Sequence, residues 1–212
     1  MERAAAMTEL SPDRIGRVTA SRIADMLAKT KSGWSASRDN YMAELITERL
    51  TGKRAAGYVN AAMQWGLDTE AEAKAAYSFY ADANISDLGF VRHPEIVMAG
   101  ATPDGGIGQT GLIELKCPLT ATHLKTLRGA EVDGSYIKQM QFQMACTGRQ
   151  WCDFVSYDPR LPEHLRLFVK RVKRDPEAIK EIEEQAVIFL EEIDKAITDL
   201  NKRYGGSKKV AA

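Results

Sequence analysis

The stretch TPDGGIGQTGLIELKCP, residues 102–118, constrains the fold more than any other part of the chain. It places a glycine-rich turn before an apolar run, a pattern typical of a β-hairpin whose second strand is buried. Two charged residues, Glu114 and Lys116, interrupt that apolar run. Because side chains alternate along a strand, both should point to one face, while Leu115 points to the other. Asp104, on the first arm of the hairpin, can then come close to Glu114.

This arrangement predicts a metal site. Two neighbouring carboxylates repel each other unless a cation lies between them, so Asp104 and Glu114 call for a hard ion with oxygen ligands, Mg²⁺ or Mn²⁺. The backbone carbonyl of Leu115 could add a ligand. Lys116 could orient or deprotonate a water and stabilise the charge of a transition state. The alternative is a surface salt bridge between Glu114 and Lys116 on a half-exposed hairpin.

Two other interpretations of the glycine-rich turn fail on their context. Gly106, Gly108 and Gly111 match the G-x-G-x-x-G pattern of dinucleotide-binding proteins, but that pattern must open a helix, whereas LIELKCP is expected to be a strand. A calcium loop that starts at Asp104 would need a glutamate at its twelfth position, which is Leu115. The glycines are therefore predicted to form a hairpin loop.

Hydrophobic periodicity along the rest of the chain predicts one α/β domain built on a mixed sheet. We expect a single domain over residues 1–212, with a flexible tail from about residue 201. The segment at 29–37 is expected to be a loop. The expected helices are 19–29 (capped by Thr19 or Ser21), 38–50, 60–80, 134–147 (ended by Gly148) and 175–200, and the expected strands are 88–94, 95–100, 112–118, 151–158 and 165–172.

Composition excludes several classes of protein. Of the 212 residues, 44% are hydrophobic and 27% charged, which is typical of a globular chain rather than a disordered one. The apolar runs are too short to cross a membrane, and the first residues lack the apolar segment of a secretory signal. The three cysteines form no CxxC pair, so they are expected to be reduced thiols in a cytoplasmic protein, neither a disulfide framework nor a zinc site.

Charge is balanced in total but uneven along the chain. There are 29 basic and 29 acidic residues, which excludes a protein coated in positive charge. Residues 164–174 carry five lysines and arginines and no acid, whereas residues 175–199 carry nine acids against two lysines. A molecule with one basic and one acidic face can bind a polyanion. The alternative is that these are the solvated faces of a strand and a helix.

A family resemblance extends these expectations. Pro103, Asp104, Glu114 and Lys116 match the P-D-x(n)-E-x-K signature of restriction-endonuclease-like nucleases. The segments RIGRVTASRI, WGLDTEAEA, TPDG…GLIELKCP, SYIKQMQFQM and WCDFVSYDPR occur in the order and spacing of the family of phage λ exonuclease and the YqaJ-type viral recombinases. The resemblance covers roughly residues 14–200. It implies a restriction-endonuclease-like core, a central mixed β-sheet flanked by helices.

The resemblance also implies an activity. Members are Mg²⁺-dependent alkaline exonucleases that degrade the 5′-ended strand of a DNA duplex processively, release mononucleotides and leave a 3′ overhang for a single-strand annealing protein. They form a ring-shaped homotrimer around DNA ends, and are encoded by phages or prophages and active in the bacterial cytoplasm. The alternatives are another nuclease of this fold, such as a resolvase or end-processing endonuclease, and a non-catalytic DNA-binding module. The intact set of Asp104, Glu114 and Lys116 argues against the last.

Roles for single residues follow from the same resemblance. Asp104, Glu114 and the Leu115 carbonyl would hold the metal, with Mn²⁺ as a possible substitute for Mg²⁺, and Lys116 would be catalytic. Glu70, in WGLDTE, matches a glutamate on a helix that completes the site. Without the resemblance, Glu70 would be interpreted as an ordinary solvated helix residue.

Six further positions match groups that contact DNA in the family. Thr102 stands in place of a serine, so the hydroxyl is kept and a methyl group is added. Lys31 stands in place of an arginine and lacks its planar fork of donors. Met63 stands where an apolar wedge helps to part the strands, with a buried core methionine as the alternative. The residues matched to the pocket for the terminal 5′-phosphate are Arg14, Ser21, Thr102 and Gln139.

Overall fold

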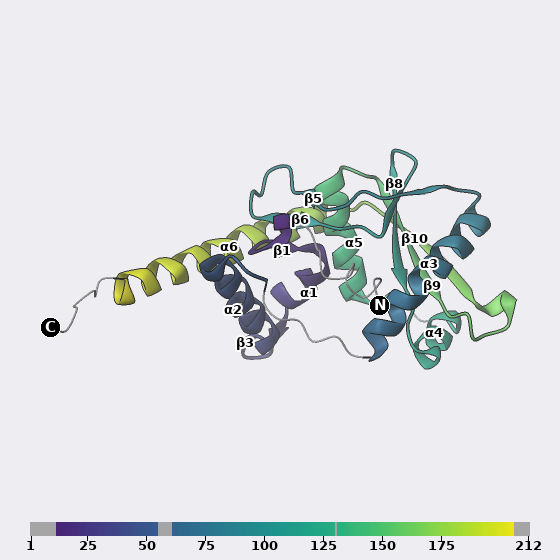
Figure 1. The fold of residues 1–212 in the computed structure, drawn as a ribbon, viewed down its shortest axis with the longest axis horizontal. Helices are drawn as coiled ribbons and strands as arrows, with labels where there is room; N and C mark the ends of the chain where they lie inside the picture. Colours follow the sequence, from purple (N-terminus) through teal and green to yellow (C-terminus); the bar gives the residue numbers. More distant parts are fainter. Residues whose placement is uncertain (1–11, 55–60, 130, 206–212) are drawn as a thin grey trace.

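A five-stranded mixed sheet, here called the central sheet, lies in the half of the ribbon away from the C-terminus (Figure 1). The computed structural model describes residues 12–54, 61–129 and 131–205. The strand order is β10-β9-β8-β7-β4; β8 and β9 are parallel and the other neighbours antiparallel, which confirms the mixed sheet expected from the sequence. The strands are β4 (Ile85–Ser86), β7 (Gly105–Ile107), β8 (Gly111–Lys116), β9 (Trp151–Tyr157) and β10 (Leu167–Lys173).

Two smaller sheets lie outside the central one. In the first, β6 lies between β1, which it pairs with in parallel, and β5, which it pairs with antiparallel. The second is a hairpin of β2 and β3, in the segment 29–37 that was expected to be a loop. The bounds are β1 (Val18–Thr19), β5 (Val91–Arg92) and β6 (Ala99–Ala101) for the first sheet, and β2 (Lys29–Thr30) and β3 (Gly33–Trp34) for the second.

The long helices agree with the periodicity of the sequence. The Asp133 side chain caps α5 by accepting a hydrogen bond from Ser135 N, and the helix ends at Gly148, whose φ of 70° is the left-handed conformation expected there. Among the described residues, no helix is long and apolar enough to span a membrane. The helices are α1 (Ile23–Met26), α2 (Ala36–Thr51), α3 (Ala61–Ala81), α4 (Thr120–Leu127), α5 (Gly134–Thr147) and α6 (Pro176–Tyr204), with 3₁₀ turns η1 (Pro12–Arg14), η2 (Ala20–Arg22) and η3 (Glu163–Leu165).

The two faces of the central sheet bury separate apolar clusters. On one face, Leu112, Cys152 and Phe154 belong to the larger cluster, which also takes in side chains of α1, α2, α5 and α6. On the other face, Ile113 and Val155 pack with the side of α3. The distal part of α6 extends beyond the rest of the ribbon (Figure 1). Neighbouring residues of β8 therefore face different helices, α5 on one side and α3 on the other.

Three expectations about local structure are corrected. The helix expected at 19–29 is shortened to η2 and α1, because Val18 and Thr19 pair with β6 instead, and the Thr19 side chain makes no capping bond. The helix α4 was not expected, and α6 continues to Tyr204, past the start of the expected tail. Pairing with distant strands overrides local helix propensity at the first of these places.

Candidate active site

The hairpin of β7 and β8 brings Asp104 to the middle of β8. Gly105 pairs with Ile113, and Gly108 makes the turn with a φ of 52°. Asp104 Oδ2 accepts a hydrogen bond of 2.7 Å from Leu115 N. The predicted hairpin is thereby confirmed, although only Gly108 of the three patterned glycines uses left-handed backbone. Gly111 instead lies in β8, where a Cβ would come within 2.1 Å of the Trp151 indole.

Glu114 is buried with both carboxylate oxygens bonded. Its side chain is 1% exposed, so the ion pair that it forms with Lys116 is buried rather than on a half-exposed surface. Lys116 Nζ lies 2.5 Å from Glu114 Oε1, and Gln139 Nε2 donates to the same oxygen at 2.7 Å. Gln143 Nε2 donates to Glu114 Oε2 at 2.6 Å. The lysine and the carboxylate therefore share one face of β8, as the alternation predicted.

The electrostatics of the site disfavour two ionised carboxylates without a cation between them. Burial, together with repulsion from Glu114, raises the pKa of Asp104 to about 8, against the opposing hydrogen bond from Leu115 N. Burial lowers the pKa of Lys116, but the attraction of Glu114 and Asp104 outweighs it and the net shift is upward. Two ionised carboxylates beside one ammonium group leave a net charge of about −1, which favours a cation.

The donor set fits a hard divalent ion. Within the described part of the chain, no group of three or more His, Cys, Asp or Glu side chains could hold a metal ion. An ion held by Asp104 and Glu114 would therefore take its other ligands from a backbone carbonyl, water and substrate. Mg²⁺ is usually bound in this way, through one or two carboxylates with several waters retained. A zinc site, which needs three or four nitrogen or sulfur ligands, does not fit.

Two further residues lie near the carboxylates, the aromatic Tyr136 and the acidic Glu70. Lys116 Nζ lies 4.8 Å from the centroid of the Tyr136 ring, which stacks in turn on Phe154 at 5.6 Å. Glu70, on α3, pairs with Lys74 at 2.7 Å and is close enough for its charge to help raise the pKa of Asp104. The structure therefore places Glu70 near the site, already engaged with a lysine.

The residues matched to the phosphate pocket are only partly brought together. Arg14 Nη1 donates to Thr102 Oγ1 at 3.1 Å, across 88 positions of sequence. Gln139 contacts Glu114. Ser21 is exposed on η2, and its position was expected at the start of a longer helix. Burial and the nearby charge of Arg54 both lower the pKa of Arg14. Arg54, which follows α2, was missed because it carries no sequence motif.

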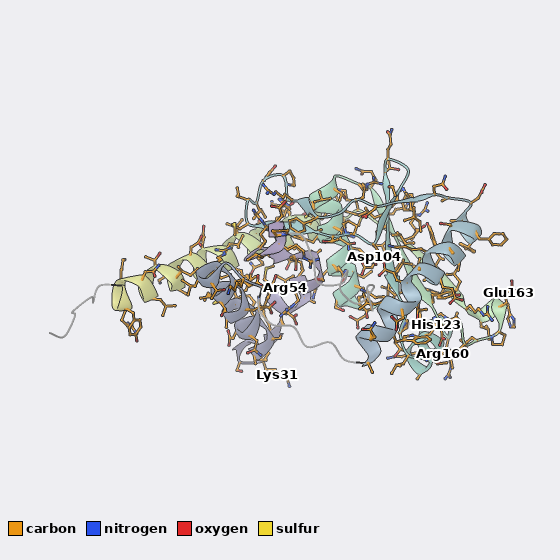
Figure 2. The ribbon with its side chains drawn as sticks, in the orientation of Figure 1. Lys31, Arg54, Asp104, His123, Arg160 and Glu163 are labelled. Atoms are coloured by element: carbon orange, nitrogen blue, oxygen red, sulfur yellow. The ribbon has the colours of Figure 1, made fainter. Side chains whose placement is uncertain are left out.

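The two other positions matched to DNA contacts lie apart from these. Lys31 is exposed between β2 and β3, and Figure 2 shows it well separated from Asp104. Its neighbour Lys29 stacks over Trp34, with Nζ 4.7 Å from the ring centroid. Met63 lies in α3, but its side chain falls outside the described residues.

The basic segment 164–174 is largely committed to the fold itself. Arg171 makes two hydrogen bonds of 2.8 Å to Asp153, and Arg174 donates to Met144 O. Arg166 donates to Leu161 O at 2.8 Å. Lys170 and Lys173, on β10, are exposed. The uneven charge of the sequence thus supplies internal ion pairs and hydrogen bonds as well as a charged surface.

Arg160, a second arginine that sequence reasoning missed, binds the chain just after the end of β8. Arg160 binds the buried Asp158 through Nε at 2.7 Å and Nη2 at 2.9 Å, and it donates to Pro118 O at 3.3 Å. Its guanidinium lies 4.3 Å from the centroid of a Trp65 ring. Burial alone would raise the pKa of Asp158, but the hydrogen bonds from Arg160 outweigh it, and the net pKa is lowered to about 2. These contacts hold the segment just after Lys116 against β9 and α3.

Comparisons with known proteins agree on one group of relatives. A family model described as "YqaJ-like viral recombinase domain" matches residues 10–150. The crystal structure of LHK-Exo in complex with dAMP is 48% identical, with 93% of this chain and 97% of that chain covered and a TM-score of 0.87. The crystal structure of an alkaline exonuclease (LHK-Exo) from Laribacter hongkongensis is 47% identical, with 97% and 98% covered and a TM-score of 0.84.

A more distant structure shares the fold. The crystal structure of a phage related exonuclease from Haemophilus somnus 129PT is 16% identical, with 87% of this chain and 96% of that chain covered and a TM-score of 0.67. No curated protein sequence matches the chain. The fold expected from the sequence, a nuclease core with a mixed sheet between helices, is confirmed by these matches.

Proposed function

The chain belongs to the YqaJ-like viral recombinase family and is a deoxyribonuclease of the exonuclease type, and we propose that it degrades one strand of a DNA duplex processively from the 5′ end, with Mg²⁺ as its cofactor. It releases mononucleotides and leaves 3′ single-stranded overhangs. The observation that carries the proposal is the buried group of Asp104, Glu114 and Lys116, where two carboxylates and one lysine face the same side of β8.

The chain's own residues have separate tasks in this reaction. Asp104, Glu114 and the carbonyl of Leu115 would hold the ion, which would supply Lewis-acid activation of a water and offset charge on the scissile phosphate. Lys116 has a raised pKa and stays protonated, so it stabilises the negative charge that develops on the phosphate. Glu70, on α3, adds a further negative charge close enough to raise the pKa of Asp104.

Recognition of the DNA end is assigned to Arg14 and its neighbours. We assign the terminal 5′-phosphate to Arg14, Thr102, Ser21 and Gln139. Arg14 supports this assignment because it already contacts Thr102, two residues before Asp104, and lies close to a second cation, Arg54. A terminal phosphate carries more charge than an internal diester, and charge-assisted bonds from guanidinium groups favour it. Lys31 and Met63 are assigned to contacts with the duplex and to strand separation.

Our proposal for assembly and partners is based on the family resemblance. The protein forms a homotrimeric ring, which explains processive work by a chain with no net charge, and it hands its product to a single-strand annealing protein. Its three cysteines are free, which fits a reducing compartment such as the cytoplasm of a bacterial host.

The proposed activity is tested with plasmid DNA in Mg²⁺ buffer. Linear duplex with 5′-phosphate ends should be consumed to mononucleotides, while the covalently closed circle of the same plasmid should survive. Cleavage of the closed circle would favour an endonuclease of the same fold. Binding of both forms without cleavage of either would favour a non-catalytic DNA-binding module.

Loss of Arg14 should remove the preference for phosphorylated ends. We expect Arg14→Ala to slow digestion of 5′-phosphate duplex by about tenfold or more, which corresponds to about 1.4 kcal/mol, while 5′-hydroxyl duplex is little affected. Arg203→Ala, which removes the same charge from the exposed end of α6, serves as the control. A mutant at position 14 that keeps its full preference for phosphate would contradict the pocket.

A further inference from the structure

Two glutamines of α5 hold the same carboxylate by different oxygens. Gln139 and Gln143 lie one helical turn apart, so both amides reach Glu114 from one side. Gln139 donates to Oε1, the oxygen that also receives Lys116, and Gln143 donates to Oε2. The two glutamines differ in their surroundings: Gln139 is half-buried, while Gln143 is fully buried.

The Gln143 amide donates to Glu114 through its nitrogen, while its oxygen is left without a hydrogen bond. Its Oε1 is among the few buried side-chain atoms in the described structure that have no hydrogen-bond partner. A buried acceptor without a donor is unfavourable, so packing or a specific role must retain it. The short bond of 2.6 Å from Nε2 to Glu114 is its only side-chain hydrogen bond within the described residues.

We propose that Gln143 is a positioning residue for the metal site. By holding Oε2 of Glu114 it keeps Oε1 directed toward Lys116 and available to a divalent ion. Lys116 and Gln139 both bond to Oε1, so they must share or release that oxygen when an ion binds, whereas Gln143 need not move. This inference rests on the proposed function, since it concerns the same site.

The same helix provides a matched control in Gln141. Gln141 is also buried, and its amide makes two hydrogen bonds, donating to Lys173 O at 2.8 Å and accepting from Asp175 N at 2.9 Å. Neither of these backbone atoms is hydrogen-bonded to Asp104 or Glu114. Gln141→Met should therefore lower stability at least as much as Gln143→Met, because it breaks more hydrogen bonds, without affecting the metal site.

The test measures metal binding directly, in the absence of DNA. Purified full-length variants are titrated with Mn²⁺ while the EPR signal of the free ion is followed. Loss of a group that orients a metal ligand typically weakens metal binding by about 10- to 100-fold, and we expect this for Gln143→Met. Single-turnover digestion in Mg²⁺ should slow by about tenfold or more, while KM for DNA ends stays within about threefold of wild type. Gln141→Met should match wild type in both assays.

Each outcome decides a separate question. Unchanged Mn²⁺ affinity in a folded Gln143→Met variant, or an equal loss in Gln141→Met, would overturn the positioning role while leaving the nuclease assignment intact. A wild-type protein that neither binds Mn²⁺ nor digests DNA would instead overturn the proposed function. If Gln143→Met does not fold, Gln143→Asn replaces it; this variant keeps an amide but withdraws it by one methylene, and wild-type Mn²⁺ affinity there would equally contradict the proposal.

Discussion

Glu114 on β8 and Asp153 on β9 are both buried acids in the middle of one sheet, but their surroundings differ. Asp153 faces α3, where Arg171 donates two bonds of 2.8 Å and Tyr77 Oη donates one of 2.7 Å. Glu114 faces α5, where one lysine is shared with a second carboxylate, Asp104. The first centre has no net charge, whereas the second keeps about one negative charge when both acids are ionised.

Under the proposed function, this difference separates a structural acid from a functional one. The carboxylate of Asp153 has an arginine of its own, and Trp151 covers that arginine at 3.6 Å from its ring centroid, so it has little need of a further cation. The carboxylates of Asp104 and Glu114 are satisfied mainly by amides and one lysine, so their repulsion persists. Burial of an acid is therefore a weak sign of function, and an unbalanced charge is a stronger one.

The largest contrast is expected between Asp104→Asn and Asp153→Asn. Removal of the Asp104 charge should lower the rate of cleavage by about 1,000-fold or more, equivalent to about 4 kcal/mol, because the proposed ion would lose a ligand. Asp153→Asn should keep near-normal cleavage per folded molecule. Single-turnover digestion of linear duplex measures both. Equal losses in the two variants would remove the distinction between the centres.

Loss of Lys116, the partner of Glu114, should slow cleavage more than loss of Arg171, the partner of Asp153. Lys116→Met should slow the chemical step by about 100- to 1,000-fold while DNA affinity changes little, because the lysine acts on charge formed in the transition state. Arg171→Met should leave the chemical step unchanged. Rapid-quench kinetics and DNA binding in Ca²⁺ separate the two effects. A Lys116→Met variant that binds DNA weakly but cleaves at the normal single-turnover rate would argue for a merely structural lysine.

For the free energy of unfolding we expect the opposite order, with Asp153→Asn more harmful than Asp104→Asn. Asp153→Asn should lower the free energy of unfolding by about 2 kcal/mol, since it weakens a buried ion pair whose arginine is 53% exposed and therefore partly solvated. Asp104→Asn should leave the metal-free stability unchanged or raise it, because it removes repulsion with Glu114. Urea denaturation in EDTA measures both. A destabilised Asp104→Asn variant would show that the acid is structural.

A further contrast concerns how stability depends on pH. The pKa of Asp104 is raised from 3.8 to about 8 in the folded chain, so between these values the folded state binds more protons than the unfolded state. Metal-free stability should therefore fall as pH rises from about 4 to about 8, with a slope from this one group of at most about 1.4 kcal/mol per pH unit. Denaturation in EDTA across this range, with Asp104→Asn as control, measures the slope; identical slopes in the two proteins would contradict the assignment.

The same titration predicts how metal binding depends on pH. A carboxyl group must lose its proton to bind an ion, so Mg²⁺ should stabilise the protein more at about pH 9 than at about pH 6. The stabilisation is measured as the shift in melting temperature on adding Mg²⁺. A shift that is independent of pH would indicate that Asp104 is already ionised at the lower pH.

Much of the site was predictable because its central contacts are local. The alternation in LIELK determined that Glu114 and Lys116 share a face, and the short glycine-rich turn determined that Asp104 returns beside them. Helices α2, α3, α5 and α6 were predicted close to their observed bounds, since each has its own apolar periodicity and, for α5 and α6, capping residues such as Asp175. These features depend on neighbours within a few residues, which the sequence displays directly.

The contacts between distant segments were decided only by the tertiary structure. The parallel pairing of β8 with β9, separated by α4 and α5, sets which residues of α5 reach Glu114, so periodicity could not single out Gln143 from Gln141. The bond from Arg14 to Thr102 spans 88 positions, and the pairing of Thr19 with Gly100 falls where the expected helix was to begin. Sequence alone determined the chemistry of the hairpin; the partners that balance or expose its charge depend on strand register and helix packing, which arise only when the whole core forms.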